Sequence, residues 1–258
     1  MLAYPCSLPL SAHTLTFLAD RIRAHRSAVG SRWRRLDPTR QALLVLAHLR
    51  CGDTYARLAG GFGISIATVF RYIREAIDLL AATAPSLGQV VAAAARRVYV
   101  IVDGTLIPID RVALDRPYFS GKHHRHGVNV QVLAGSRGQL LWASPALPGA
   151  VHDLAAARTH GVPATLARYG LACYGDAAYQ GAGPHIAVPF RRRPRRLSRN
   201  QKLVNRNQAR NRALGERAVA ILKCWRLLAK LRCCPHRTTA IIAAIRVLQA
   251  VHEQPQRG

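Results

Sequence analysis

The sequence is poor in acidic side chains, with 12 Asp and Glu against 38 Lys and Arg in 258 residues and a net charge of +26. A charge excess of this size is self-repulsive unless a polyanion compensates it. Nucleic acid is the favoured polyanion, because Lys and Arg are spread along the whole chain and their phosphate contacts release counterions from a duplex. The alternative is a charged surface that serves solubility alone.

Other common features are also lacking. No apolar run reaches the roughly 18 residues of a membrane-spanning helix, and the N-terminal segment lacks the basic start of a secretory signal. We therefore expect the protein to stay inside the cell. The six cysteines have no CxxC spacing, and the neighbours Cys233 and Cys234 suit a disulfide poorly, which favours reduced, mostly buried thiols. Without a GxSxG elbow, a Walker loop or a dinucleotide fingerprint, neither a serine hydrolase nor a nucleotide cofactor is indicated.

Residues 37–82 have the pattern of helices. The first helix has Asp37 as its N-cap candidate and a stop at Gly52. A short helix follows, then a glycine turn around residues 61–63 and a longer helix that Ser65 would cap. The apolar positions of this last helix repeat every three or four residues, which predicts one buried face. They are Ile66, Val69, Phe70, Ile73, Ile77 and Leu80.

This succession of helix, glycine turn and helix resembles a helix-turn-helix DNA-binding unit. We expect residues 37–86 to form that domain, after a helical lead-in over residues 1–36. The face opposite the apolar stripe carries polar side chains that can reach phosphates or base edges, namely Thr68, Arg71, Tyr72 and Arg74. The predicted DNA contacts here are Ser65, Thr68, Arg71 and Arg74. A plain helical hairpin is the alternative.

From residue 96 the pattern changes to strands. Three β-rich runs are separated by turn signals, and a GSRG turn joins the second and third as a hairpin would. A short helix, a fourth strand and a long helix come next. These six segments are residues 98–109, 127–138, 139–147, 152–161, 171–181 and 203–231. Their order matches a ribonuclease-H-like fold, so we expect an α/β, mixed-sheet catalytic domain over residues 96–250, preceded by the small all-α domain and followed by a tail, residues 251–258.

Three of the acids are placed where they could work together. Asp103 in VDG and Asp176 in GDA each stand where an apolar strand meets a glycine-flanked turn, and Glu216 lies in the middle of the long helix. Metal-dependent phosphoryl transfer needs several oxygen ligands that converge on two ions roughly 3.5–4 Å apart. Clustered carboxylates are tolerated only when metal or nearby cations compensate them. A sheet can bring such distant positions together.

Five motifs in this region resemble those of bacterial insertion-sequence transposases of the DDE class, which share a domain with the Harbinger-type transposase-derived nucleases. They are VDGTLIPID (102–110), YFSGKHHRHG (118–127), PGAVHD (148–153), GDAAYQG (175–181) and the set Arg212, Glu216 and Lys223 followed by WRLL. Each motif is weak alone, but all five occur in the family's order. The resemblance covers residues 96–232, and the preceding helices suit the family's N-terminal module.

The resemblance implies that Asp103, Asp176 and Glu216 are the catalytic, metal-binding triad, with Mg²⁺ or Mn²⁺ as cofactor and two ions in the site. Asp153, in the HD motif, is a further candidate that could supply a metal ligand or replace Asp176 as the second acid. We favour Asp176 because it ends the fourth strand, whereas Asp153 opens the preceding helix, where a first-turn cap is its simpler role.

The long helix offers a check that is independent of the family. At 100° per residue, Arg212 and Lys223 share one helical face with Glu216. A carboxylate between two cations can hold metal while Arg and Lys bind the DNA backbone; the alternative is a surface stripe of ion pairs. One departure from the family is Ala209, since related transposases often carry a tyrosine at this position.

Two basic stretches remain. KHHRH (122–126) is predicted to contact the substrate on or before the second strand, with Lys122 as a DNA contact; a zinc site is disfavoured because the histidines are packed too closely. RRRPRR (191–196) is predicted to be a flexible phosphate-binding loop in which Arg192 and Arg193 contact DNA. A solvated charge run is the alternative.

Together these features predict a transposase that binds double-stranded DNA, both the terminal inverted repeats and the target. Metal-activated water would hydrolyse a phosphodiester at the element end, and the freed 3′-hydroxyl would attack target DNA through the same site. We expect a cytoplasmic, nucleoid-associated bacterial protein, and paired end cleavage favours a homodimer or higher multimer. The rival hypotheses are a non-catalytic DNA-binding protein and a nuclease without strand transfer.

Overall fold

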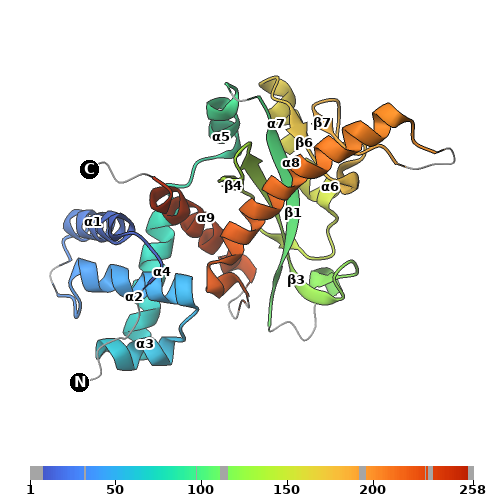
Figure 1. Cartoon of the computed structure of the whole chain (residues 1–258). Helices are drawn as coiled ribbons and strands as arrows, with labels where there is room; N and C mark the ends of the chain where they lie inside the picture. The colour runs from blue at the N-terminus through green and yellow to red at the C-terminus, as the bar shows by residue number, and fades with distance from the viewer. Residues whose placement is uncertain are drawn as a thin grey trace. The chain divides into compact units, whose positions relative to one another are not determined.

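The structure, a computed structural model, describes residues 8–31, 33–96, 98–110, 116–191, 196–229, 231 and 235–254. The chain divides into two compact units (Figure 1). The first contains the residues up to 84 together with 224–229 and those from 240 onward. The second contains residues 85–223 and 230–239. No described helix is long and apolar enough to cross a membrane.

The first unit is helical and begins with α1 (Ala12–Ala28), α2 (Pro38–Cys51), α3 (Tyr55–Phe62) and α4 (Ile66–Ala81). Asp37 caps α2 as predicted, because its Oδ1 accepts hydrogen bonds from the backbone nitrogens of Thr39 and Arg40 at 2.9 and 3.0 Å. Gly52 ends the helix with a left-handed φ of 73°. Both predicted boundaries of this helix are confirmed.

The turn between α3 and α4 is shorter than its glycines suggest. Gly60 and Gly61 lie inside α3, and only Gly63 takes a left-handed φ, at 66°. Ser65 then caps α4 as predicted, since its Oγ accepts a hydrogen bond from Thr68 N at 3.2 Å. The helix, turn and helix arrangement is confirmed, with the turn beginning at Gly63.

The predicted faces of α4 are partly wrong. Val69, Ile73, Ile77 and Leu80 are buried as expected, but Ile66 and Phe70 are exposed, and the polar residues Thr68 and Tyr72 are buried. Burial of the two polar side chains is tolerated because their hydroxyls have partners. Tyr72 Oη accepts a hydrogen bond from Arg35 N at 3.0 Å, and Thr68 Oγ1 pairs with Ser65 Oγ at 2.9 Å.

The chain returns to the first unit near its C-terminus, which the sequence did not reveal. The long helix predicted over residues 203–231 is α8 (Arg199–Lys223), and it ends before the short 3₁₀ helix η3 (Arg226–Ala229). Between them Trp225 is fully buried, donates through Nε1 to Gln249 Oε1 at 2.9 Å and lies under the guanidinium of Arg50. Gln249 belongs to α9 (Pro235–His252).

The second unit contains the sheet. Its strand order is β2-β3-β1-β6-β7, with β4 and β5 also paired to β3; β1 is antiparallel to β3 and parallel to β6. This mixed order confirms an α/β, ribonuclease-H-like fold behind a helical N-terminal region. In chain order the elements before α8 are α5 (Leu87–Ala94), β1 (Val100–Pro108), η1 (Arg116–Tyr118), β2 (Phe119–Ser120), β3 (Arg125–Gly135), β4 (Leu140–Ala143), β5 (Leu147–Pro148), α6 (Asp153–Thr159), α7 (Val162–Arg168), β6 (Cys173–Tyr174), η2 (Ala177–Tyr179) and β7 (Ile186–Ala187).

Helix α8 packs across β1 and β3, and Figure 1 shows it passing over β1. The contact depends on Gly215, where a Cβ would lie 2.9 Å from Ile101 Cγ2 and 3.7 Å from Asp103 Cβ. Because glycine lets the helix backbone approach the strand this closely, the middle of α8 lies directly over the part of β1 that carries Asp103.

Candidate active site

Asp103 lies within β1 rather than at its end. The antiparallel pairing with β3 continues without a break from Val100 to Pro108, with Asp103 opposite Val132 and Gly104 opposite Gln131. The prediction that VDG marks a turn is therefore wrong. Gly104 has another reason to be glycine, because a Cβ at that position would lie 2.1 Å from Asp153 Oδ1. The missing side chain makes room for a second carboxylate.

Asp103 shares its surroundings with two other aspartates. Burial, together with the negative charges of Asp176 and Asp153, raises the pKa of Asp103 to about 6. The hydrogen bond from Gly104 N to Asp103 Oδ1, at 2.9 Å, and the charge of Arg212 act in the opposite direction. The fold thus brings three acids that are far apart in sequence into electrostatic contact.

Asp153, at the first position of α6, is held by side chains. Its Oδ1 accepts hydrogen bonds from Asn129 Nδ2 at 2.9 Å and Gln131 Nε2 at 3.4 Å. Its Oδ2 pairs with Lys122 Nζ at 3.2 Å. The residue that precedes α6 as N-cap is His152, and no side-chain cap bond is made there. The carboxylate of Asp153 is thus aimed at the sheet.

Behind Asp153 lies a chain of buried hydrogen bonds that the sequence reasoning missed. Tyr179 Oη donates to Gln131 Oε1 at 2.6 Å, and Gln131 Nε2 donates to Asn129 Oδ1 at 2.8 Å. All three side chains are buried. Burial raises the pKa of the Tyr179 hydroxyl well above its usual value, so Tyr179 remains a proton donor. The available signal was the alternation in VNVQV, which puts two amides on one face of an otherwise apolar strand.

The predicted fourth strand is shorter than expected, since β6 covers only Cys173–Tyr174; Asp176 lies two residues after it and caps η2. Its Oδ1 accepts a hydrogen bond from Ala178 N at 2.8 Å. The same short helix carries Tyr179, so the Asp176 loop is tied to Gln131 and, through it, to the residues that hold Asp153. Arg191 also donates to this loop, from Nη2 to the carbonyl oxygen of Ala177 at 2.8 Å.

Glu216 is placed differently from the three aspartates. Its side chain is 68% exposed and forms an ion pair with Arg212, whose Nη2 lies 3.9 Å from Glu216 Oε1. Lys223, on the same helix, has a lowered pKa because of burial and the nearby charge of Arg125, while the charge of Asp103 raises it. Arg212 and Lys223 therefore both reach the electrostatic surroundings of Asp103, whereas the Glu216 carboxylate faces solvent.

The donor chemistry of the site suits a divalent cation. Carboxylate oxygens are the ligands that Mg²⁺ and Mn²⁺ prefer. The raised pKa of Asp103 reflects burial first and nearby negative charge second, and a bound cation would offset both. Within the described part of the chain, however, no group of three or more His, Cys, Asp or Glu side chains is close enough to hold an ion. A cavity of about 290 Å³ adjoins the site, with Gly104, Lys122 and Asp153 among its lining residues.

The predicted DNA contacts vary in how exposed they are. Arg71 is exposed on α4, although its Nη2 lies 3.3 Å from Thr68 Oγ1, and Arg74 forms an ion pair with Asp78 at 3.9 Å. Lys122 is engaged with Asp153. Arg192 and Arg193 lie outside the described residues.

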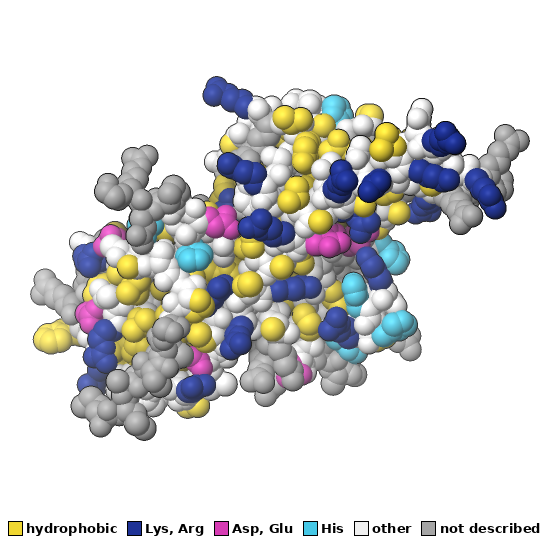
Figure 2. Space-filling model, in the orientation of Figure 1, with side chains coloured by type: hydrophobic (Ala, Val, Ile, Leu, Met, Phe, Trp, Pro, Cys, Tyr) yellow, Lys and Arg dark blue, Asp and Glu magenta, His cyan; other side chains and the backbone are white. Residues whose placement is uncertain are grey.

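Over α8, Figure 2 shows a gathering of Lys and Arg side chains. The helix contains seven basic residues: Arg199, Lys202, Arg206, Arg210, Arg212, Arg217 and Lys223.

Comparison with known families gives two matches. A family model described as DDE superfamily endonuclease matches residues 102–250, which contain the sheet and the three aspartates. A second model, described as the helix-turn-helix of DDE superfamily endonuclease, matches residues 34–86. No curated protein and no solved structure matches the chain. The helix-turn-helix match precedes the endonuclease match in the chain, just as the N-terminal helices precede the sheet.

Proposed function

The chain belongs to the DDE superfamily endonucleases, and from this membership we propose that it is a metal-dependent DNA transposase. The exposed residues of the helix-turn-helix, Ser65, Arg71 and Arg74, would bind the terminal inverted repeats, whereas the buried Thr68 would support the start of α4. The sheet unit would cut the strand at the element end and join it to target DNA. The observation that carries the proposal is the meeting of Asp103, Asp153 and Asp176 around one position of β1.

The proposed catalytic groups are Asp103, Asp176 and Glu216, with Asp153 as an additional metal ligand. A bound Mg²⁺ or Mn²⁺, two ions in the full site, would compensate the carboxylates and the scissile phosphate and lower the pKa of a water molecule. The chain's own contribution is orientation. Asn129 and Gln131 hold Asp153 at a fixed angle from the rigid strand β3, and Gly104 leaves the space that this carboxylate needs.

The cations around the site would position the DNA. Arg212 and Lys223 on α8 lie within electrostatic range of Asp103 and can neutralise phosphates next to the scissile bond. Lys122, which pairs with Asp153, would neutralise a phosphate on that side of the site. Arg192 and Arg193 are proposed as further phosphate contacts from the segment after β7. Cleavage at two ends favours a homodimer or higher multimer on DNA.

Joining can be tested separately from cutting. A duplex that carries an element end with a pre-cut 3′-hydroxyl should be joined to a target plasmid when Mg²⁺ or Mn²⁺ is present. A chain that cuts uncut ends but never yields joined product would be a nuclease without strand transfer. The end sequence can be read from DNA flanking the gene, where we expect imperfect inverted repeats bracketed by short direct duplications.

One observation favours a second candidate, a DNA-binding protein without catalysis. The exposed Glu216 carboxylate is turned toward Arg212 and is not among the charges that shift the pKa of Asp103. Glu216→Ala separates the two functions. A transposase should lose strand cleavage in this variant and keep its affinity for DNA, whereas for the rival function the unaltered chain would already show binding without cleavage.

A further inference from the structure

A second basic surface lies in the helical unit, between the start of α4 and the segment that joins α1 to α2. These two parts of the chain line a groove of about 1120 Å³. Among the described residues, its lining includes three arginines, Arg34, Arg35 and Arg71, and no acidic side chain. One wall is formed by Ser31 and residues 33–35. Ser31 and Trp33 precede the matched helix-turn-helix, and Arg34 and Arg35 are its first two residues. We call this segment the linker wall.

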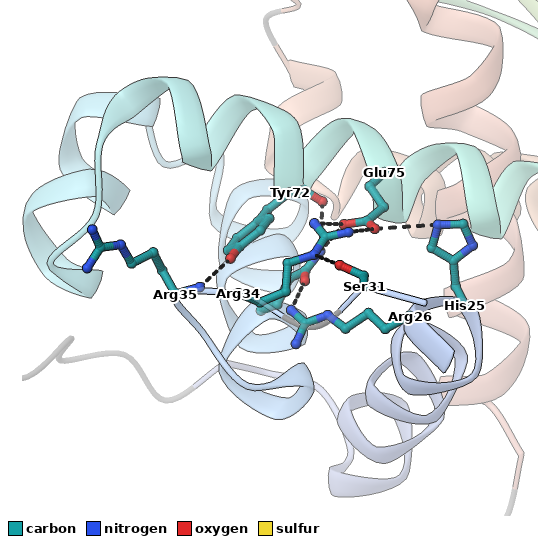
Figure 3. A network of polar contacts seen from close by, with 8 residues as sticks. His25, Arg26, Ser31, Arg34, Arg35, Tyr72 and Glu75 are labelled. Carbon is teal, nitrogen blue, oxygen red and sulfur yellow. Dashed lines mark hydrogen bonds and ion pairs between the residues drawn. The ribbon is translucent and has the colours of Figure 1, made fainter. Parts of the chain in front are cut away.

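The linker wall is fixed to α4 by buried and half-buried contacts, which Figure 3 shows. Arg34 Nη2 and Nη1 donate to the two oxygens of Glu75 at 3.0 and 3.3 Å, and Gln41 Nε2 donates to the same carboxylate at 3.0 Å. The backbone nitrogen of Arg35 donates to Tyr72 Oη. Bidentate pairing of this kind holds a guanidinium in one geometry, so the backbone on either side of Arg34 is held in place.

The two neighbours of Arg34 are exposed. Trp33 is 95% exposed, and Arg35 is exposed as well, whereas Arg34 is half-buried against Glu75. In Figure 3 the guanidinium of Arg35 lies away from the Glu75 cluster. The exposed tryptophan, on a segment held by Arg34, offers a large aromatic area that is favourable to bury against a partner.

We propose that the linker wall is a second DNA-contacting element. It would bind the duplex beside the DNA groove in which α4 would lie. Trp33 would pack against sugars and base edges, and Arg35 would bind a backbone phosphate. The inference rests on the proposed DNA-binding function of α4. The charge of the groove indicates the class of partner, because the three arginines in its described lining attract a polyanion. Aromatic and Arg side chains together can contact both the bases and the phosphates of DNA.

Tryptophan fluorescence gives a direct readout, because Trp33 is the exposed one of three tryptophans. Trp142 and Trp225 are buried. In the full chain, a mixed-sequence duplex about three helical turns long should protect Trp33 from quenching by acrylamide and shift its emission. Trp33→Phe should remove both the accessible fraction and its response to DNA. A Trp33 that stays equally open to acrylamide in the complex would overturn the proposal.

Affinity for the same duplex provides the second arm. Trp33→Ala and Arg35→Ala should each weaken binding about tenfold, and Arg35→Ala should also reduce the slope of log affinity against log salt by about one. Trp33→Phe should keep part of the affinity, which separates contact loss from misfolding. The matched control is Arg21→Ala, which removes the same charge from the exposed side of α1, outside the groove.

The outcomes separate this inference from the function on which it rests. If Arg71→Ala weakens binding while Trp33→Ala and Arg35→Ala behave like the Arg21→Ala control, the helix-turn-helix binds DNA and the linker wall does not contact it. If the unaltered chain binds no duplex at all, both fail.

Discussion

At the scale of single residues, the surroundings of Asp103 disfavour its ionised form, which therefore opposes folding at neutral pH. Its pKa of about 6 exceeds the value near 3.9 of an unfolded chain, so the folded state binds this proton more tightly than the unfolded state. The stabilising effect of that proton is complete below about pH 4 and is lost as the pH rises through about 6. At neutral pH the metal-free protein therefore carries a buried charge that favours unfolding.

The first prediction follows from this sign. Asp103→Asn should raise the free energy of unfolding of the metal-free protein at pH 7 by roughly 1–2 kcal/mol, because it removes the buried charge and keeps the acceptor for Gly104 N. Thermal unfolding in chelator, measured from pH 4 to 7, checks it. The gain should vanish near pH 4, and a variant less stable than the parent at pH 7 would contradict the placement of Asp103.

The second residue-scale prediction concerns Gly104. Gly104→Ala places a methyl group on the Asp153 carboxylate, and this should cost about 1–3 kcal/mol of stability and most of the cleavage activity. Gly88→Ala is the control, since a Cβ there meets no atom within 4 Å. Urea unfolding and a cleavage assay compare the two. Equal behaviour of the two variants would show that Asp153 does not lie against the strand.

At the scale of elements, three segments far apart in sequence meet through one buried chain of side chains. Tyr179 on η2 donates to Gln131 on β3, and the amides of β3 hold Asp153 on α6. Tyr179→Phe should leave Gln131 Oε1 buried without a donor, at a cost of about 1–3 kcal/mol. We expect cleavage to fall severalfold while DNA binding stays unchanged.

The control for this element is Tyr169→Phe, which removes a hydroxyl from a more exposed tyrosine on the same unit. The two variants should be compared in their dependence on Mg²⁺ concentration as well as in rate. A purely structural role of Tyr179 would lower stability without moving the Mg²⁺ midpoint. A shifted midpoint in Tyr179→Phe alone would support its role in positioning the Asp153 and Asp176 loops.

Local signals predicted these elements well, and tertiary contacts explain the failures. Asp37, Gly52 and Ser65 act on their own backbone neighbours, so their caps were readable from sequence. The extension of β1 past Asp103 depends on β3, and the glycine after Asp103 serves Asp153, a partner 49 residues away (153 − 104). Burial of Tyr72 likewise depends on Arg35, which no helical periodicity can reveal. The roles of Asp176 and Glu216 came from family resemblance and stay predictions.

At the scale of the whole molecule, charge dominates the interaction with DNA. A net charge of +26 and a helix α8 with seven basic residues predict many phosphate contacts. Affinity for duplex DNA should therefore fall roughly a thousandfold or more between 50 and 200 mM salt. Fluorescence anisotropy over that range tests it, and a nearly flat salt dependence would contradict a polyanionic partner as the reason for the composition.

The central claim is that distant carboxylates form one metal-dependent cutting site, and the most direct measurement is cleavage of duplex DNA by the full chain with its divalent-ion requirement. We expect cleavage only with Mg²⁺ or Mn²⁺, and its loss in Asp103→Asn while DNA binding is retained. Cleavage that persists in chelator, or at an undiminished rate in Asp103→Asn, would contradict the site described.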